Sequence, residues 1–169
     1  MLFRSPEFLG YLTYFSSDTA LSLAGTILMG CVLTMIVQSS SAMLGITIAL
    51  AITGTISFQT AAALVLGENI GTTITALIAC IGTNTDAKRT ALAHACFNLS
   101  GVCLIALMFL PYISLVDWII PGVPDFIDGD GSKPYIAAHI AASHTIFNVT
   151  ATIVFLPFLK YLEIGRAHV

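Results

Sequence analysis

Charged residues are scarce in this chain of 169 residues, of which only 9% are Asp, Glu, Lys or Arg. Soluble globular domains have about 25% charged residues, so the composition argues against an ordinary soluble domain. Six basic and nine acidic residues give a net charge of −3, which leaves no basic surface for a nucleic-acid partner. With 57% hydrophobic residues and a mean hydropathy of +0.94, the chain is expected to be an all-α membrane protein.

The chain also lacks the common motifs for disulfides and metals. Its four cysteines all lie in apolar stretches and form no C-x-x-C pair, so we interpret them as small packing residues. The segment Asp128–Gly131 resembles the start of a calcium loop, but no Glu stands at the twelfth position. It is therefore predicted to be a turn.

Charge is absent over three stretches that are long enough to cross a bilayer. They are Ala20–Val37, Thr90–Leu110 and Tyr135–Leu156, with 18, 21 and 22 residues. As helices they would be about 27 to 33 Å long, close to the hydrocarbon thickness of a membrane. A charged side chain at the bilayer centre costs roughly 3 kcal/mol, so these stretches predict a multi-pass protein of the cytoplasmic membrane, surrounded by membrane lipid.

The few cations and anions predict an orientation. Lys88 and Arg89 precede the second span and Lys160 follows the third, so an antiparallel pair of spans places all three on one side. The segment Pro111–Lys133 carries four Asp residues and a single Lys. Because positive loops remain in the cytoplasm, the acidic segment is expected to be external, with Trp118 as an interfacial anchor.

Three shorter apolar pieces separate the first and second spans: Ala42–Thr53, Phe58–Leu66 and Ile70–Ile81. Each would cover about half of the membrane or less. Short helices at membrane depth are tolerated only where protein or a water-filled cavity surrounds them, so broken or re-entrant half-helices are expected around a site. Ser57 is predicted to cap the second piece, and Gly54 and Gly67 are predicted to end pieces.

Four polar residues in a row, Gln38-Ser39-Ser40-Ser41, follow the first span directly. The start of a half-helix offers free N–H groups and a positive dipole end, and the serine hydroxyls add donors, so an oxyanion could be held there without Lys or Arg. The Gln38 carbonyl and the serine oxygens could equally bind a small cation. Alternatively, the serines hydrogen-bond to preceding carbonyls and only bend a helix.

A second polar group is Gly67-Glu68-Asn69-Ile70-Gly71-Thr72-Thr73. The two glycines allow the chain to turn, while Asn69, Thr72 and Thr73 supply oxygens and donors. Glu68 is the only charged residue between Asp18 and Asp86, which makes it a functional candidate. The alternative is that Glu68 caps the N-terminus of the following half-helix from the membrane surface.

The pattern H-x-x-F-N occurs twice, at His94 with Asn98 and at His144 with Asn148. The spacing of four places His and Asn on one face of each helix, which lipid would not accept. A structural role, in which these side chains hydrogen-bond across helices, is favoured over direct ligation.

These motifs resemble the sodium-dependent phosphate cotransporter family, in its bacterial branch. The resemblance extends from Val37 to Pro157, over the serine run, the Gly67–Thr73 segment, Arg89–His94 with Phe97-Asn98, and His144 with Phe147-Asn148. It implies two inverted repeats, each with a Gln-Ser-Ser-Ser segment, of which this chain is the second with a closing helix. Residues 1–169 are then a single, partial membrane domain that lacks the first repeat and the regulatory domain found in many bacterial members.

The resemblance also implies a shared site at the middle of the membrane. The phosphate-binding residues would be Ser39, Ser40, Ser41, Thr72 and Thr73. The sodium-binding residues would be Gln38, Ser39, Asn69, Thr72 and Glu68. No cofactor is expected, and sodium is a co-transported ion. The partners would be inorganic phosphate, sodium, and either a first repeat or a second copy of the chain.

Two departures from the family pattern stand out. Many family repeats have Ala where this chain has Glu68, so the resemblance does not imply an indispensable role for Glu68. The first repeat is missing and Gly165–Val169 does not continue the pattern, so the chain is expected to be a fragment.

The sequence leaves two other functions open. One is an intramembrane serine hydrolase, with a nucleophile among Ser39–Ser41 and His94 or His144 as base, although the chain has no G-x-S-x-G motif. The other is a non-transporting membrane interaction subunit. An enzyme is not expected.

Overall fold

The computed structural model describes residues 19–158, which contain six α-helices, one short 3-10 helix and no strand. The helices are α2 (Ala20–Val37), α3 (Ser40–Ile52), α4 (Phe58–Ala79), α5 (Thr85–Leu107), α6 (Phe109–Ile119) and α7 (Ile136–Phe155), followed by η2 (Leu156–Phe158). The expected all-α fold is confirmed. Four segments are long and apolar enough to cross a membrane: α2, α4, α5, and α7 together with η2.

The predicted break after the first span is confirmed. Helix α2 ends at Val37, and Gln38 adopts a left-handed conformation with φ of 57°. Ser39 is the N-cap of α3, because its side-chain oxygen accepts a hydrogen bond from the Ala42 N–H. Helix α3 has only 13 residues and is followed by Gly54 at φ of 72°, so it is the expected half-length helix between two turns.

The second predicted break is wrong. Helix α4 is one continuous helix of 22 residues that begins after the Ser57 cap, as expected, and runs through Gly67 without interruption. A Cβ atom at Gly67 would overlap the backbone carbonyl of Ile27 on α2, and a Cβ at Gly30 on α2 would overlap the carbonyl of Leu64. Glycines 67 and 71 therefore form a G-x-x-x-G face that lets the backbones of α2 and α4 touch. The predicted pieces Phe58–Leu66 and Ile70–Ile81 are halves of one membrane-length helix.

The second and third predicted spans are confirmed with shifted ends. Helix α5 begins earlier than expected, where the Asn84 side chain caps it, and ends at Leu107 rather than at Leu110. Pro111 instead lies in the first turn of α6. Backbone N–H groups in the first turn have no carbonyl partner within the helix, so proline loses no hydrogen bond there. Helix α6 was not expected. Trp118 on α6 is 83% exposed, which suits the predicted interfacial position.

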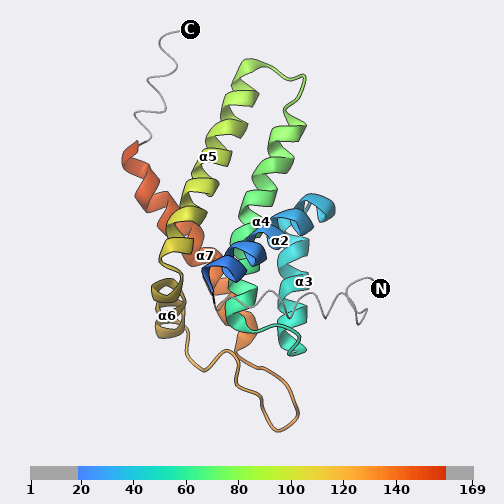
Figure 1. The fold of residues 1–169 in the computed structure, drawn as a ribbon, viewed down its shortest axis with the longest axis vertical. Helices are drawn as coiled ribbons and strands as arrows, with labels where there is room; N and C mark the ends of the chain where they lie inside the picture. The colour runs from blue at the N-terminus through green and yellow to red at the C-terminus, as the bar shows by residue number, and fades with distance from the viewer. Residues whose placement is uncertain (1–18, 159–169) are drawn as a thin grey trace.

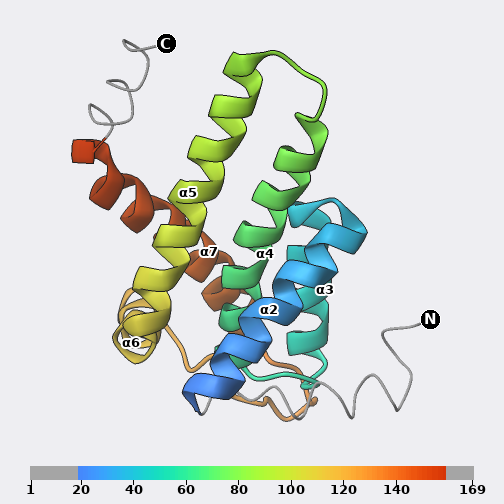
Figure 2. The ribbon, with the colours of Figure 1, turned by 45° about the horizontal axis from the view of Figure 1, so that its top comes forward.

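Helix α4 is the centre of the fold. Helices α2 and α3 lie along one side of it, and α5 and α7 lie along the other, as Figures 1 and 2 show. The side chains of Ala61–Leu66 are all buried in the shared core. Long stretches of α2, α5 and α7 instead expose large apolar side chains, for example Leu28, Leu99 and Ile153, as expected of a surface in contact with lipid.

The two ends of the molecule differ in charge, as predicted. The hairpin between α4 and α5, next to Lys88 and Arg89, lies at the end opposite to the acidic loop before α7 (Figure 1). At the acidic end, the Asp125 carboxylate accepts hydrogen bonds from the Phe58 N–H and from Lys133, at 3.1 Å and 2.8 Å. This loop thereby holds the start of α4. Lys160, the third cation of the predicted cytoplasmic side, lies outside the described residues.

The Asp128–Gly131 segment forms the predicted turn. The Asp128 N–H bonds to the Ser132 carbonyl at 2.8 Å, and the Gly131 N–H bonds to the Asp128 carbonyl at 2.9 Å. Hydrogen bonds from the side chain and backbone of Ser132 hold the pKa of Asp130 below its usual range. All four cysteines are free; Cys31 is buried, whereas Cys96 and Cys103 are exposed rather than packed.

Candidate functional site

The serine run occupies the turn between α2 and α3 and the first residues of α3. The hydroxyls of Ser39 and Ser41 lie 3.4 Å apart, and Gln38 and Ser41 are exposed. The first backbone N–H groups of a helix have no partner within it. Those of Ser40 and Ser41 accordingly have no hydrogen-bond partner in the described part of the chain.

This turn lies within the depth of the helix bundle rather than at its end. Thr34, one helical turn before Gln38, packs against Gly71, which is 13 residues after the start of α4. At 1.5 Å per residue, Gly71 is about 20 Å along a helix about 33 Å long. Figure 2 shows α4 and α5 continuing beyond the α2–α3 turn. The exposed donors are therefore at a depth where lipid alone could not satisfy them.

The polar side chains of α4 are turned toward their own backbone. The Thr72 hydroxyl donates to the Glu68 carbonyl, the Thr73 hydroxyl donates to the Ile70 carbonyl, and the Asn69 amide donates to the Val65 carbonyl, all within 2.8 Å. Asn69 and Thr73 are buried, whereas Thr72 is only half-buried. Thr72 is thus the most accessible of the three.

Glu68 is buried to 2% exposure in the middle of α4, and its Oε1 accepts a hydrogen bond of 2.7 Å from the Thr47 hydroxyl of α3. The hypothesis that Glu68 caps a following half-helix is wrong, because α4 has no break there. No Lys, Arg or His of the described residues lies within 4.0 Å of its carboxylate. A buried carboxylate without a counter-ion is costly, so Glu68 stays a functional candidate.

The structure does not gather all of the predicted site residues at one point. Thr47, the hydrogen-bond partner of Glu68, is seven residues after the start of α3. The contact therefore lies about 10 Å along α3 from the serine turn. No hydrogen bond joins Gln38 or the serines to Asn69, Thr72 or Glu68 within residues 19–158. The serine turn and Glu68 are two separate polar positions on the α3–α4 pair.

The two H-x-x-F-N patterns have the same local geometry. In each, the Asn amide donates to the carbonyl of the His four residues earlier, at 3.3 Å for Asn98 and 2.8 Å for Asn148. Asn98 is buried, His94 is exposed, and His144 and Asn148 are half-buried. The predicted hydrogen bonds across helices are not observed for the two Asn amides, which bond within their own helices.

Two other chemistries have no geometry to support them in the described residues. The hydrogen bonds of Ser39 run to Ser41 and to the Ala42 N–H, and none reaches a His. No group of three or more His, Cys, Asp or Glu side chains is placed to hold a metal ion between residues 19 and 158.

Two features of the site were not foreseen. Thr47, the hydrogen-bond partner of Glu68, is a single Thr in an apolar run and carries no sequence signal. The contact of α2 with α4 had a signal, because glycines four residues apart in an apolar stretch are typical of close helix packing. The α2 side of this contact is formed by Gly30, which lies far from Gly67 in the sequence.

Comparisons with known proteins bear on the whole site. The model of the Na⁺/Pi-cotransporter family matches residues 12–116, which include the serine turn and Gly67–Thr73. Protein YqeW of Bacillus subtilis (strain 168), described as uncharacterized, is 37% identical over 131 residues, or 78% of this chain. Sodium-dependent phosphate transport protein 2C of Rattus norvegicus and protein 2B of Homo sapiens are each 43% identical over 82 residues, or 46% of this chain. No solved structure gives a significant match.

The chain is much shorter than these relatives. The matched part covers 38% of YqeW, 14% of the rat protein and 12% of the human protein. The family match ends at residue 116 and does not include α7 with His144 and Asn148.

Proposed function

Because the chain belongs to the Na⁺/Pi-cotransporter family, we propose that it supplies about half of a site that carries inorganic phosphate across the cytoplasmic membrane together with sodium. The observation that carries this proposal is the start of α3. Two backbone N–H groups without partners, flanked by serine hydroxyls, lie there at membrane depth. This is the arrangement with which helix N-termini bind phosphate.

Electrostatics favours coupling to a cation. Phosphate brings up to two negative charges, and the described Lys and Arg residues are Lys88, Arg89 and Lys133, near the two ends of the bundle. Backbone N–H groups and hydroxyls compensate only part of the cost of burying that charge, and bound sodium compensates more. Phosphate should therefore bind well only with its cations.

The ligand assignment follows the two polar segments of the sequence, Gln38–Ser41 and Gly67–Thr73. We assign phosphate to Ser39, Ser40 and Ser41, with Thr72 and Thr73 completing the site, and sodium to oxygens of Gln38, Ser39, Asn69, Thr72 and Glu68. For Asn69 and Thr72 to bind an ion, their side chains must leave the α4 carbonyls that they now contact. We propose that this exchange accompanies ion binding.

The exposed polar groups imply a partner. Gln38 and Ser41 are both exposed in the described part of the chain. Facing lipid, each unpaired group would cost on the order of 1 to 3 kcal/mol. A first repeat, or a second copy of the chain, would cover them and supply the other half of the site.

The test uses a complete protein with both repeats, carrying Gln38→Ala, Ser39→Ala or Thr72→Ala. Each change is expected to lower sodium-dependent uptake of labelled phosphate by at least tenfold, while the protein still inserts. The control is Thr145→Ala, because Thr145 is exposed on α7 and only bonds to the Ala141 carbonyl. Unaltered uptake in all three variants would remove the site assignment.

A further inference from the structure

His139 has a buried polar atom without a hydrogen-bond partner among the described residues. Its side chain is fully buried in the first turn of α7, and the unpartnered atom is the ring nitrogen Nε2. Buried polar groups almost always have a partner, so each exception calls for a physical explanation. The residues assigned to phosphate and sodium do not include His139.

Three helices meet at this ring, at the end of the molecule that carries the acidic loop (Figure 1). The Oδ1 atom of Asp117, near the end of α6, lies 3.8 Å from Nε2. The other ring nitrogen, Nδ1, lies 2.8 Å from the backbone carbonyl oxygen of Tyr135. The ring of Phe58, the first residue of α4, packs edge to face against the imidazole, with centroids 5.5 Å apart. These contacts fix the orientation of the imidazole.

Neither neutral form of the imidazole satisfies both ring nitrogens. A carbonyl and a carboxylate only accept hydrogen bonds, whereas a neutral imidazole has one N–H donor and one bare nitrogen. With the proton on Nδ1, the lone pair of Nε2 faces the Asp117 carboxylate. With the proton on Nε2, the lone pair of Nδ1 faces the Tyr135 carbonyl at 2.8 Å. Only the imidazolium, with a proton on each nitrogen, can donate to both oxygens.

Asp117 is placed to complete this pair. Its side chain is 44% exposed, and no other cation of residues 19–158 lies within 4.0 Å of its carboxylate. A charge-assisted hydrogen bond between N and O is about 2.8 Å long, so a side-chain movement of roughly 1 Å closes the gap. Two hydrogen bonds to one bridging water would hold the two atoms roughly 4.5 Å apart, so the separation of 3.8 Å favours direct contact.

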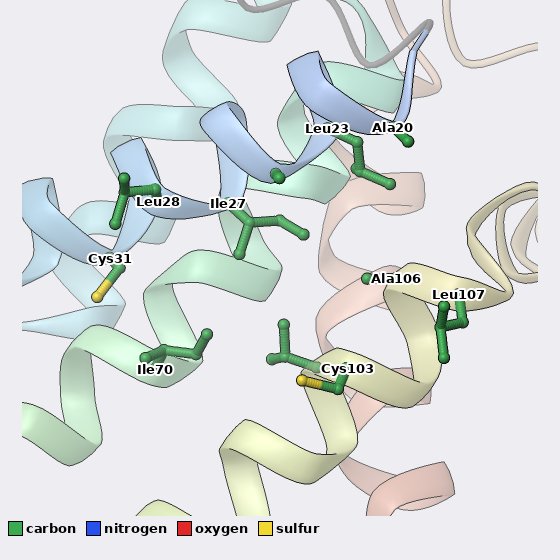
Figure 3. Close-up of a pocket in the computed structure, with 11 residues that line it drawn as sticks. Ala20, Leu23, Ile27, Leu28, Cys31, Ile70, Cys103, Ala106 and Leu107 are labelled. Carbon is green, nitrogen blue, oxygen red and sulfur yellow. The ribbon is translucent and has the colours of Figure 1, made fainter.

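The other charged and titratable groups near the ring have partners of their own. The Asp125 carboxylate accepts hydrogen bonds from the Phe58 N–H and from Lys133, and the Tyr112 hydroxyl of α6 donates to the Ser143 carbonyl. Helix α3 has no ionisable side chain, and the groove between α2 and α5 is lined by no carboxylate, imidazole or amine (Figure 3). The remaining charged residues and histidines of the described chain lie farther along the helices or in the exposed loop: Glu68, Asp86, Lys88, Arg89, His94, Asp128, Asp130 and His144.

We propose that His139 and Asp117 form a proton-binding site at the acidic end of the molecule. Nδ1 keeps its proton on the Tyr135 carbonyl, while Nε2 takes a second proton from water on the side of the acidic loop and donates it in a hydrogen bond to the Asp117 carboxylate. The resulting ion pair joins α6 to α7 beside the start of α4. When the pH rises, Nε2 returns this proton to water and the contact between the two helices weakens. The proposal does not depend on the proposed transport function.

The test uses the full chain in lipid nanodiscs, with its histidines labelled with nitrogen-15. The NMR shifts of the ring nitrogens distinguish a neutral imidazole from an imidazolium, and the variants His94→Gln, His144→Gln and His168→Gln assign the His139 signals by exclusion. We expect both ring nitrogens of His139 to carry a proton at neutral pH. Asp117→Asn removes the opposite charge and should lower the proton affinity of His139 by about tenfold or more.

The matched control is Asp128→Asn, which removes a negative charge from the same end at an exposed position and retains an oxygen for the Gly129 N–H. His139 should keep both protons in this variant. A neutral His139 in the unaltered protein at neutral pH would overturn the proposal, as would a proton affinity that Asp117→Asn leaves unchanged. Equal losses in the two Asp variants would indicate only the general negative field of this end, and would overturn it too.

The contact between α6 and α7 has its own measurement. Asp117→Asn should lower the melting temperature at neutral pH but not in alkaline buffer, because the folded protein binds a proton that the unfolded chain releases, and this stabilisation is lost as the pH rises. A decrease that is the same at both pH values would show that the Asp117 carboxylate acts without the proton, and the proposed site would be wrong.

Discussion

At the scale of single residues, the contact between Thr47 and Glu68 is the clearest test of the buried polar core. Thr47→Val keeps the shape of the side chain but removes the hydroxyl that donates to the Glu68 carboxylate at 2.7 Å. Leaving a buried acceptor unsatisfied costs about 1 to 3 kcal/mol, so the free energy of unfolding should fall by that amount. Denaturant unfolding in detergent micelles measures it.

The control for this change is Thr47→Ser, which retains the hydroxyl. It should recover most of the stability lost in Thr47→Val, because the donor to Glu68 is restored. If Thr47→Val is as stable as the unaltered protein, or less destabilised than Thr47→Ser, the hydrogen bond to Glu68 does not carry the expected stability and the prediction is wrong.

At the scale of helices, the close contact of α2 with α4 depends on glycine. A Cβ at Gly67 would overlap the Ile27 carbonyl, which is backbone and cannot rotate away. Gly67→Ala should therefore separate the two helices and lower the free energy of unfolding by about 1 to 3 kcal/mol, as overpacking does elsewhere. Thermal unfolding in detergent, together with the rate of trypsin cleavage, would report both changes.

Gly45→Ala on α3 is the matched control. Nothing lies within 4 Å of a Cβ placed there, so this change should be neutral or stabilise α3 by up to about 1 kcal/mol through helix propensity. Equal losses at both positions would mean that the tight α2–α4 contact does not exist in solution.

The serine turn and the glycines of α4 show which parts of the fold the local sequence determines and which parts it does not. The serine turn was predicted correctly because its signals, an apolar run followed by cap residues, are local. Gly67 and Gly71 are compatible with a break and with a close helix contact. Whether α4 breaks at these glycines or packs closely on α2 depends on Gly30, and only tertiary packing places Gly30 beside Leu64. The same holds for Thr47, whose partner is 21 residues away.

At the scale of the whole molecule, the chain by itself should insert into membranes but not transport. Repeat-built transporters work by moving one repeat against the other around a shared site, and a chain that supplies one repeat, as proposed here, lacks that counterpart. Vesicles that contain only this chain are expected to show no sodium-driven uptake of labelled phosphate. Saturable uptake would contradict this expectation, and crosslinking the same sample would show whether two copies had joined to complete the site.

The left-handed backbone at Gln38 links the stability of the α2–α3 turn to the residue at this position. Gln38 is the only residue other than glycine with positive φ between residues 19 and 158, and this conformation costs an ordinary side chain about 1 to 2 kcal/mol. Glycine would hold the turn more cheaply, so the binding role proposed for the Gln38 side chain would come at a cost in stability. Gln38→Gly should accordingly raise the melting temperature while uptake by the complete transporter is lost, whereas Gln38→Ala should lose uptake without the gain in stability. An opposing change in stability and activity at one position would distinguish a residue kept for its side chain from one kept for its fold.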